Sequence, residues 1–234
     1  MAIGAAALPL NPLLIRPSRP LPGRVGIVGA GTIGPDIGYY LKSAIPGLEL
    51  VLVDIDEKPL QAALKRFSTY AAKGVARRKM SPEAAEAVQQ GITITTDYAD
   101  MAGCDWVIEA ATEDLPLKRR IFSMIEEEVG PDCVITSNTS SLPAHELFCE
   151  MKRPGRTTVT HFFAPAWRNP AVEVIAWEQG DPAVTAWLRW LFAATGKVPQ
   201  AISRCCSPTW IRAPLGLKLS GPSHALAPCV SSWA

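Results

Sequence analysis

Two residues in the stretch HFFAPAWRNPAVEVI have side chains suited to moving a proton. His161 opens this stretch, and Glu173 follows twelve residues later, enclosed by valines. An imidazole titrates near neutrality and can take a proton from a reacting hydroxyl, while a carboxylate on its other ring nitrogen fixes the tautomer. The prolines at 165 and 170 predict a loop that turns the chain back between two extended segments. The spacing therefore permits an oriented base, and equally permits a polar pair buried in a core.

The segment RVGIVGAGTIG predicts a phosphate-binding loop between a strand and a helix. Gly29, Gly31 and Gly34 form a GxGxxG pattern directly after a β-branched run, and Thr32 and Ile33 lie between the last two glycines. The first glycine allows a tight turn, the second lets the backbone approach a pyrophosphate, and the third lets helix and strand pack closely. The alternative is a glycine-rich turn without a ligand.

An acidic residue at the end of the next predicted strand indicates which dinucleotide binds. Asp54 lies 20 residues beyond Gly34. A carboxylate at this position accepts hydrogen bonds from the ribose hydroxyls of adenosine and repels a 2′-phosphate. The sequence therefore predicts NAD as the cofactor in preference to NADP.

The elements that position these residues alternate along residues 23–202. Short β-branched runs and helical stretches follow one another, which is typical of a parallel sheet covered on both faces. We predict an α/β fold, a doubly wound Rossmann-type domain with a mostly parallel sheet. The predicted strands are RVGIV, LELVLVD, ITITT, WVIEA, CVITSN, TTVTHFF, AVEVIAW and KVPQAI. Predicted helices follow the glycine-rich loop and cover LPLKRRIFSMIEEEVG and PAVTAWLRWLFAATG.

The crossover between residues 57 and 90 is longer than one short helix requires. KPLQAALKRFSTYAAKGVARRK and PEAAEAVQQ predict a protruding helical pair, with Ser81-Pro82 at the start of the second helix. The first helix carries Lys73, Arg77, Arg78 and Lys79 near its end. This cluster is either a solvated helix face or a binding surface for phosphates.

Neither end of the chain has a helical or strand period. Residues 1–22 are apolar and proline-rich without the basic start of a signal peptide, and they predict a disordered arm. Residues 203–234 contain no Asp or Glu and are rich in Ser, Pro and Cys, a composition that does not form a packed domain. One hypothesis is a shift of reading frame near Ala201, which amphipathic helices encoded in another frame would support.

The composition favours a cytoplasmic protein that binds small molecules. The net charge is +1 with both signs interspersed, which argues against nucleic acid or an anionic membrane as partner. The six cysteines show no metal-ligand spacing, so neither a metal site nor a disulfide framework is predicted. No segment reaches the roughly 18 apolar residues that span a bilayer.

Taken together, the motifs resemble the NAD-binding half of the L-3-hydroxyacyl-CoA dehydrogenases of fatty-acid β-oxidation. GAGTIG, VLVDID, VIEAATEDLPLKRRIF, SNTSSLP and the HFF-to-VEVI stretch follow the family's order between Arg24 and Ala201. The resemblance implies oxidation of an L-3-hydroxyacyl-CoA to the 3-oxoacyl-CoA. Relatives that act on gulonate or serve as lens crystallins imply two alternatives, a dehydrogenase of a non-CoA hydroxy acid and a non-catalytic nucleotide-binding protein.

The resemblance also implies the roles of individual residues. His161 matches the catalytic base, Glu173 the carboxylate that orients it, and Ser140 the hydroxyl that contacts the substrate oxygen. The implied cofactor contacts beyond the glycine-rich loop are Glu113, Lys118 and Asn138. The implied contacts with coenzyme A, within the helical pair, are Arg77 and Lys73.

The sequence departs from the family at two places. Ala164 stands where the family usually has an asparagine that contacts the nicotinamide side of the site. After the KVPQAI segment, the family continues into a helical domain that closes the substrate pocket and forms a homodimer. We therefore expect this chain to bind NADH weakly and to show little turnover, with an oligomeric state that the sequence leaves open.

Overall fold

The computed structural model describes residue 13 and residues 15–202 as one layered α/β domain. Its eight-stranded sheet has the order β3-β2-β1-β4-β5-β6-β7-β8. Every neighbouring strand pair is parallel except the antiparallel pair β6 and β7. The doubly wound, mostly parallel fold is thus confirmed. The predictions for residues 1–12 and for the tail from residue 203 lie outside the described residues.

All the predicted strands are present, and helices or loops connect them. The strands are β1 (Arg24–Val28), β2 (Glu49–Val53), β3 (Ile92–Thr95), β4 (Trp106–Glu109), β5 (Val134–Ser137), β6 (Thr157–Phe162), β7 (Ala171–Ile175) and β8 (Val198–Ile202). The α-helices are α1 (Gly34–Ala44), α2 (Glu57–Ala76), α3 (Pro82–Ala87), α4 (Leu115–Glu128), α5 (Ala144–Phe148) and α6 (Pro182–Ala194). Two 3₁₀ helices, η2 (Tyr98–Met101) and η3 (Pro154–Arg156), complete the described elements. In the described part of the chain, no helix is both long and apolar enough to cross a membrane.

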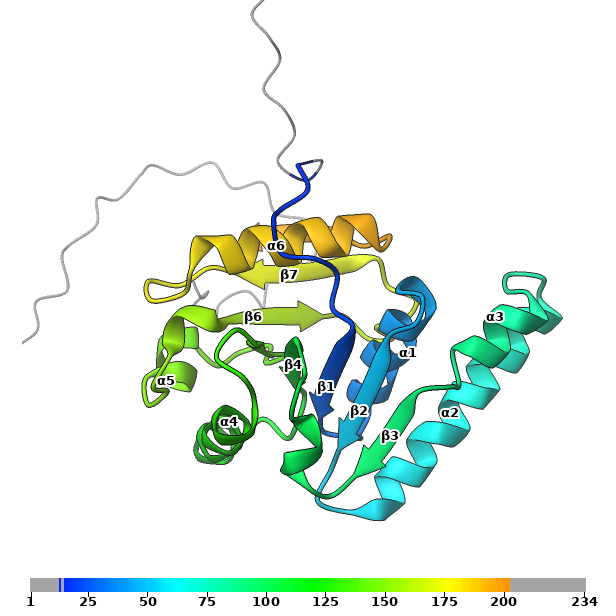
Figure 1. Cartoon of the computed structure of the whole chain (residues 1–234), viewed down its shortest axis with the longest axis horizontal. Coiled ribbons are helices and arrows are strands. Elements are labelled where there is room, and N and C mark those ends of the chain that lie inside the picture. Colours follow the sequence, from blue (N-terminus) through cyan, green and yellow to red (C-terminus); the bar gives the residue numbers. More distant parts are fainter. Residues whose placement is uncertain (1–12, 14, 203–234) are drawn as a thin grey trace, which may run out of the picture.

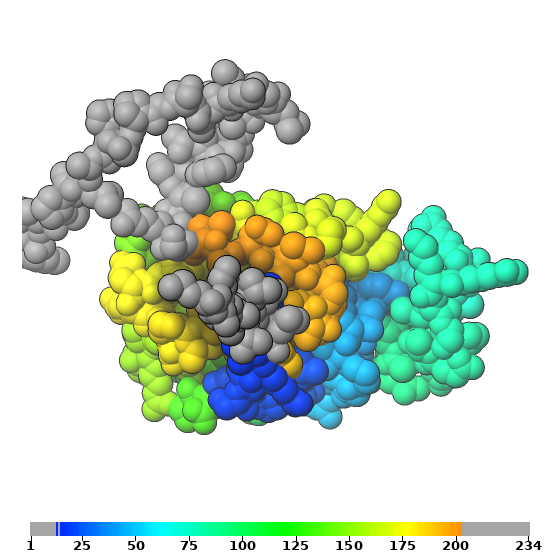
Figure 2. Space-filling view, turned by 90° about the horizontal axis from the view of Figure 1, so that it is seen from above, coloured from blue at the N-terminus to red at the C-terminus, as the bar shows by residue number. Residues whose placement is uncertain are grey.

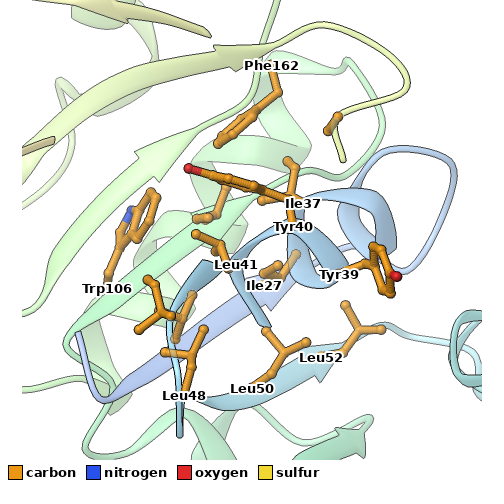
Figure 3. Close-up of a cluster of buried hydrophobic side chains, with 14 of the residues drawn as sticks. Ile27, Ile37, Tyr39, Tyr40, Leu41, Leu48, Leu50, Leu52, Trp106 and Phe162 are labelled. Atoms are coloured by element: carbon orange, nitrogen blue, oxygen red, sulfur yellow. The ribbon is translucent and has the colours of Figure 1, made fainter. Parts of the chain in front are cut away.

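The sheet has a hydrophobic core on each face. In β2, Leu50 and Leu52 join the core beneath α1, α2 and α6, whereas Val51 and Val53 join the core beneath α4 and α5. Successive side chains of a strand point to opposite faces, so a strand buried on both sides needs a continuous apolar run. Figure 3 shows the first core, where side chains of α1 pack on those of β1 and β2.

The helical pair α2 and α3 extends from the body of the domain (Figures 1 and 2). Asp56 accepts a hydrogen bond from the Lys58 amide at the start of α2, and Ser81 accepts one from the Ala84 amide at the start of α3. The sequence predicts that the first helix continues to Lys79, but it ends at Ala76. The reason is local, because Arg78 has a φ of 55°, a left-handed conformation that cannot continue an α-helix.

The N-terminal arm predicted to be disordered through residue 22 contacts the domain over its last residues. The guanidinium of Arg19 donates to the carbonyl of Asp132 at 2.9 Å and lies 5.4 Å from the centre of the Trp187 ring. The Trp187 indole donates to the carbonyl of Pro20 at 2.9 Å. These cation–π and indole contacts hold the segment against α6 (Figure 1).

Candidate functional site

The glycine-rich loop between β1 and α1 requires its glycines for three different reasons. Gly29 has a φ of +109°, and a Cβ on it would lie 2.6 Å from the carbonyl oxygen of Ala110. A Cβ on Gly34 would lie 1.9 Å from the carbonyl oxygen of Gly29. A Cβ on Gly31 would meet no atom within 4 Å, so this residue leaves open space in front of the loop. That pattern matches a tight turn, a close helix contact and an approach path for a pyrophosphate.

An arginine that the sequence analysis did not identify holds this loop. The guanidinium of Arg66, on α2, donates to the carbonyls of Gly31 and Thr32, both at 2.8 Å. The same group forms an ion pair with Asp36 at 2.5 Å, and the Tyr70 hydroxyl donates to that carboxylate at 3.0 Å. The loop is therefore fixed from outside by α2 before any ligand binds.

A first cleft of about 450 Å³ lies beside the glycine-rich loop at the end of β2. One carboxylate oxygen of Asp54 accepts a hydrogen bond from the Ala30 amide at 2.7 Å. Ile55, 91% exposed, borders the cleft together with Leu117 and Met124. An acid next to exposed apolar side chains offers a surface for a ribose and a flat purine ring.

A second cleft of about 320 Å³ continues from the loop to the ends of β4, β5 and β6. It lies where the strand order reverses between β1 and β4, the topological switch point at which doubly wound sheets bind ligands. Six of the residues predicted for the site border this cleft. They are Ile33, Glu113, Lys118, Asn138, Ser140 and His161, with Phe162, Phe163 and Ala164 beside them.

The predicted pair of His161 and Glu173 is in direct contact. The two residues are opposite each other in the antiparallel register of β6 and β7. The Nδ1 atom of His161 lies 2.9 Å from a carboxylate oxygen of Glu173, and both side chains are partly exposed. With its proton on Nδ1 donated to the carboxylate, the imidazole keeps Nε2 available as a base.

A buried ion pair that the sequence analysis missed lies behind the second cleft. Glu109, at the end of β4, is fully buried and accepts hydrogen bonds from the Lys118 ammonium at 2.6 Å and the Ser137 hydroxyl at 2.5 Å. Burial raises the pKa of the Glu109 carboxyl, and the Lys118 charge partly offsets this. The available signal was an acid inside the apolar run WVIEA, which requires a buried partner.

The ammonium group of Lys118 is surrounded by acceptors from the protein. Besides its bond to Glu109, its ammonium donates to the carbonyl of Ala111 at 3.2 Å and lies 3.3 Å from the carboxylate of Glu113. An ammonium has three hydrogens, and three protein acceptors surround this one. Lys118 borders the second cleft, and its charge holds Glu109 and Glu113 in place. Its contact with the cofactor stays a prediction.

Glu113 presents a charged carboxylate to the second cleft. Burial alone would raise its pKa, but the hydrogen bonds from Thr139 and Ser141 and the charge of Lys118 outweigh burial and lower it. A carboxylate that remains ionised can accept hydrogen bonds from hydroxyl groups of a ligand.

The remaining predicted residues differ in their placement. The side-chain oxygen of Asn138 accepts a hydrogen bond from the Phe162 amide at 2.9 Å, which fixes its side chain at the edge of the second cleft. Lys73 and Arg77 are exposed near the end of α2 and border neither of the two clefts.

Together, the glycine-rich loop, the acid after β2 and the polar cleft at the switch point define a dehydrogenase domain of the dinucleotide-binding class. The family described as "3-hydroxyacyl-CoA dehydrogenase, NAD binding domain" matches residues 24–205. The chain therefore belongs to the 3-hydroxyacyl-CoA dehydrogenase family of oxidoreductases, and its cofactor is NAD.

Known proteins are similar over most of this chain. The fatty acid oxidation complex subunit alpha of Psychrobacter arcticus is 34% identical over 76% of the chain and 25% of that protein. The 3-hydroxybutyryl-CoA dehydrogenase of Escherichia coli has a TM-score of 0.74 at 31% identity, over 77% of this chain and 38% of the other. The (S)-3-hydroxybutyryl-CoA dehydrogenase of Ralstonia eutropha has a TM-score of 0.74 at 32% identity, over 78% and 64%. The chain thus spans between a quarter and two thirds of these relatives.

The open space at Gly31 leads to a first prediction. A Gly31→Ala variant should lose at least about tenfold in NADH affinity, because its methyl group fills the approach path of the pyrophosphate. Its melting temperature should not change, because Gly31 has no positive φ and its Cβ meets nothing. Gly130→Ala, at a second unobstructed glycine outside both clefts, is the control. Equal NADH affinity in the two variants, measured by fluorescence titration, would refute the assignment.

Proposed function

We propose that the chain oxidises the 3-hydroxyl group of an L-3-hydroxyacyl-CoA to the 3-oxoacyl-CoA, with NAD as the oxidant. The observation that carries the proposal is the His161–Glu173 pair at the second cleft, which adjoins the glycine-rich loop. The two similar solved structures are named as dehydrogenases of 3-hydroxybutyryl-CoA, and they support a CoA thioester as the substrate.

In the proposed reaction, His161 removes the hydroxyl proton of the substrate through Nε2. Glu173 accepts the Nδ1 proton in a hydrogen bond, so it holds the ring in the required tautomer and stabilises the imidazolium. Bound NAD would supply the acceptor for the hydride from the carbon that carries this hydroxyl group. The C–H electron pair and the O–H proton thereby depart to different groups, and a carbonyl remains.

The other polar residues of the cleft position the two ligands. Ser140 hydrogen-bonds the substrate oxygen, so it helps to place the reacting hydroxyl near His161. Glu113 would accept hydrogen bonds from the nicotinamide ribose, and Asn138 would contact the cofactor with the amide hydrogens that its bond to Phe162 leaves free. Reaction requires both ligands in the same cleft, and its apolar side is provided by Ile33 and Phe163.

We assign the recognition of coenzyme A to the basic end of α2. Replacing Lys73 and Arg77 together by alanine should weaken the use of acetoacetyl-CoA about fivefold, since two exposed charge contacts contribute roughly 1 kcal/mol. Oxidation of NADH by acetoacetate, which lacks the CoA phosphates, should not change. Lys152→Ala combined with Arg153→Ala, an exposed basic pair elsewhere, is the control.

The same assay tests the proposed substrate class. NADH oxidation should be faster with acetoacetyl-CoA than with acetoacetate at equal concentration. Equal rates with the two substrates, together with no effect of the double variant on either, would favour a dehydrogenase of a non-CoA hydroxy acid.

A further inference from the structure

Lys197 is a buried cation without an acidic partner in the described residues. It follows α6, is 7% exposed, and forms none of the ion pairs found in residues 15–202. Its ammonium donates to the carbonyl oxygens of Ala166 and Asn169, the latter at 2.5 Å, and lies 4.3 Å from the centre of the Tyr40 ring. Burial lowers the pKa of Lys197 to about 8. The ammonium is thus directed at two carbonyls of the loop between β6 and β7.

These two carbonyls belong to a single helical turn, residues 165–169. The carbonyl of Pro165 accepts hydrogen bonds from the amides of Arg168 at 3.0 Å and Asn169 at 2.9 Å. The last carbonyls of a helical turn lack partners within the turn and carry partial negative charge. Lys197 therefore satisfies one buried and one partly buried carbonyl, neither of which accepts a hydrogen bond from a backbone amide of residues 15–202.

The 165–169 turn links the second cleft to the helical pair. Phe163 and Ala164 precede it directly and border the cleft, and the ring of Phe163 lies 4.6 Å from the imidazole of His161. On its other side, Trp167 packs on Tyr70 of α2, with 5.0 Å between the ring centres. A change in the orientation of the turn would move Phe163 relative to the imidazole.

Lys197 also lies close to a core residue that adjoins the second cleft. Its ammonium lies 6.0 Å from the ring of Phe162, the residue between His161 and Phe163. Phe162 and Tyr40 lie close together in the core shown in Figure 3, with 6.1 Å between the ring centres. Lys197 is therefore in contact with both the core and the loop.

We propose that Lys197 is a positioning residue, which acts through the 165–169 turn to hold Phe163 against the imidazole of His161. Its effect on turnover rests on the proposed function. The ring contact does not, so it can be tested in the chain whether or not the proposed reaction occurs.

The test is the NMR resonance of the His161 Cε1 proton in the full chain, assigned by its loss in His161→Gln. The Phe163 ring shifts this resonance, and Phe163→Leu gives its position without the ring. Lys197→Met should move the resonance most of the way to the Phe163→Leu position. Lys197→Arg, which keeps donors for the carbonyls, should leave the resonance at its wild-type position. If the methionine variant does not fold, Lys197→Gln is measured instead, because its shorter amide cannot reach both carbonyls.

A matched control comes from a second buried lysine. Lys42 is 9% exposed and donates to the carbonyl of Leu48 at 2.5 Å, at the end of α1. Lys42→Met should leave the His161 resonance unchanged. An unchanged resonance in folded Lys197→Met or Lys197→Gln, or an equal change in Lys42→Met, would overturn the proposal. Where the wild-type chain oxidises NADH, Lys197→Met should lower kcat with little change in NADH affinity.

Discussion

Replacing Lys118 by methionine is expected to lower the free energy of unfolding by about 3–5 kcal/mol, because it leaves a buried carboxylate without its cation. Glu109 would retain the hydrogen bonds from the Ser137 hydroxyl and the Ala111 amide, but no positive charge would remain beside it. Methionine fills similar volume, so the loss reflects the charge and not a cavity. Urea denaturation at neutral pH measures the effect.

The loss should depend on pH in a defined direction. Burial already raises the pKa of Glu109, and removal of the Lys118 charge raises it further. A carboxyl group whose folded pKa lies above its unfolded pKa binds its proton more tightly when folded, so stability is gained as pH falls and lost as pH rises. The difference in the free energy of unfolding between wild type and Lys118→Met should therefore decrease as the pH is lowered from about 7 to about 5.

The double variant Glu109→Gln with Lys118→Met is the control for this prediction. A neutral amide in place of Glu109 can still accept from the Ala111 amide and contact Ser137, and it leaves no buried charge. The double variant should recover most of the lost stability. A single variant as stable as wild type, or a double variant no more stable than the single one, would show that Lys118 does not stabilise the fold by compensating the charge of Glu109.

The sequence allowed the sheet and much of the candidate site to be predicted because both follow from local patterns. Strands buried on both faces appear as apolar runs, and the GxGxxG motif has a fixed position between a strand and a helix. The contact of His161 with Glu173 follows from two strands joined by a short proline-containing loop, since the antiparallel register then places them opposite each other. Their roles in catalysis remain a prediction.

Other features could not be predicted because their partners are remote in sequence or lie in the backbone. Arg66 binds carbonyl oxygens of the glycine-rich loop, and Lys197 binds those of the 165–169 turn. Every residue has a backbone carbonyl, so the sequence does not indicate which one a side chain will bind. Glu109 pairs with Lys118 and Ser137 only once β4, β5 and α4 are packed together. For the same reason, the sequence could not show that the ammonium of Lys118 has three protein acceptors around it.

The His161→Gln variant should reduce the rate of NADH oxidation by acetoacetyl-CoA about 10²–10⁴-fold, the usual contribution of a general acid–base group. Under the proposed mechanism, the imidazolium of His161 would donate a proton to the carbonyl oxygen in this direction, a step that a glutamine cannot perform. NADH affinity should change little, because the glycine-rich loop and Asp54 are untouched. His145→Gln, an exposed histidine on α5, is the control and should behave as wild type.

The most direct test of the account is a single-turnover measurement of NADH absorbance with the protein in excess over NADH, so that even one slow catalytic cycle is visible. With saturating acetoacetyl-CoA, wild type and His145→Gln should show the same exponential decay, and His161→Gln should be slower by about 10² or more at unchanged NADH affinity. Equal decay in wild type and His161→Gln would contradict the assignment of His161, paired with Glu173, as the acid–base group of this site.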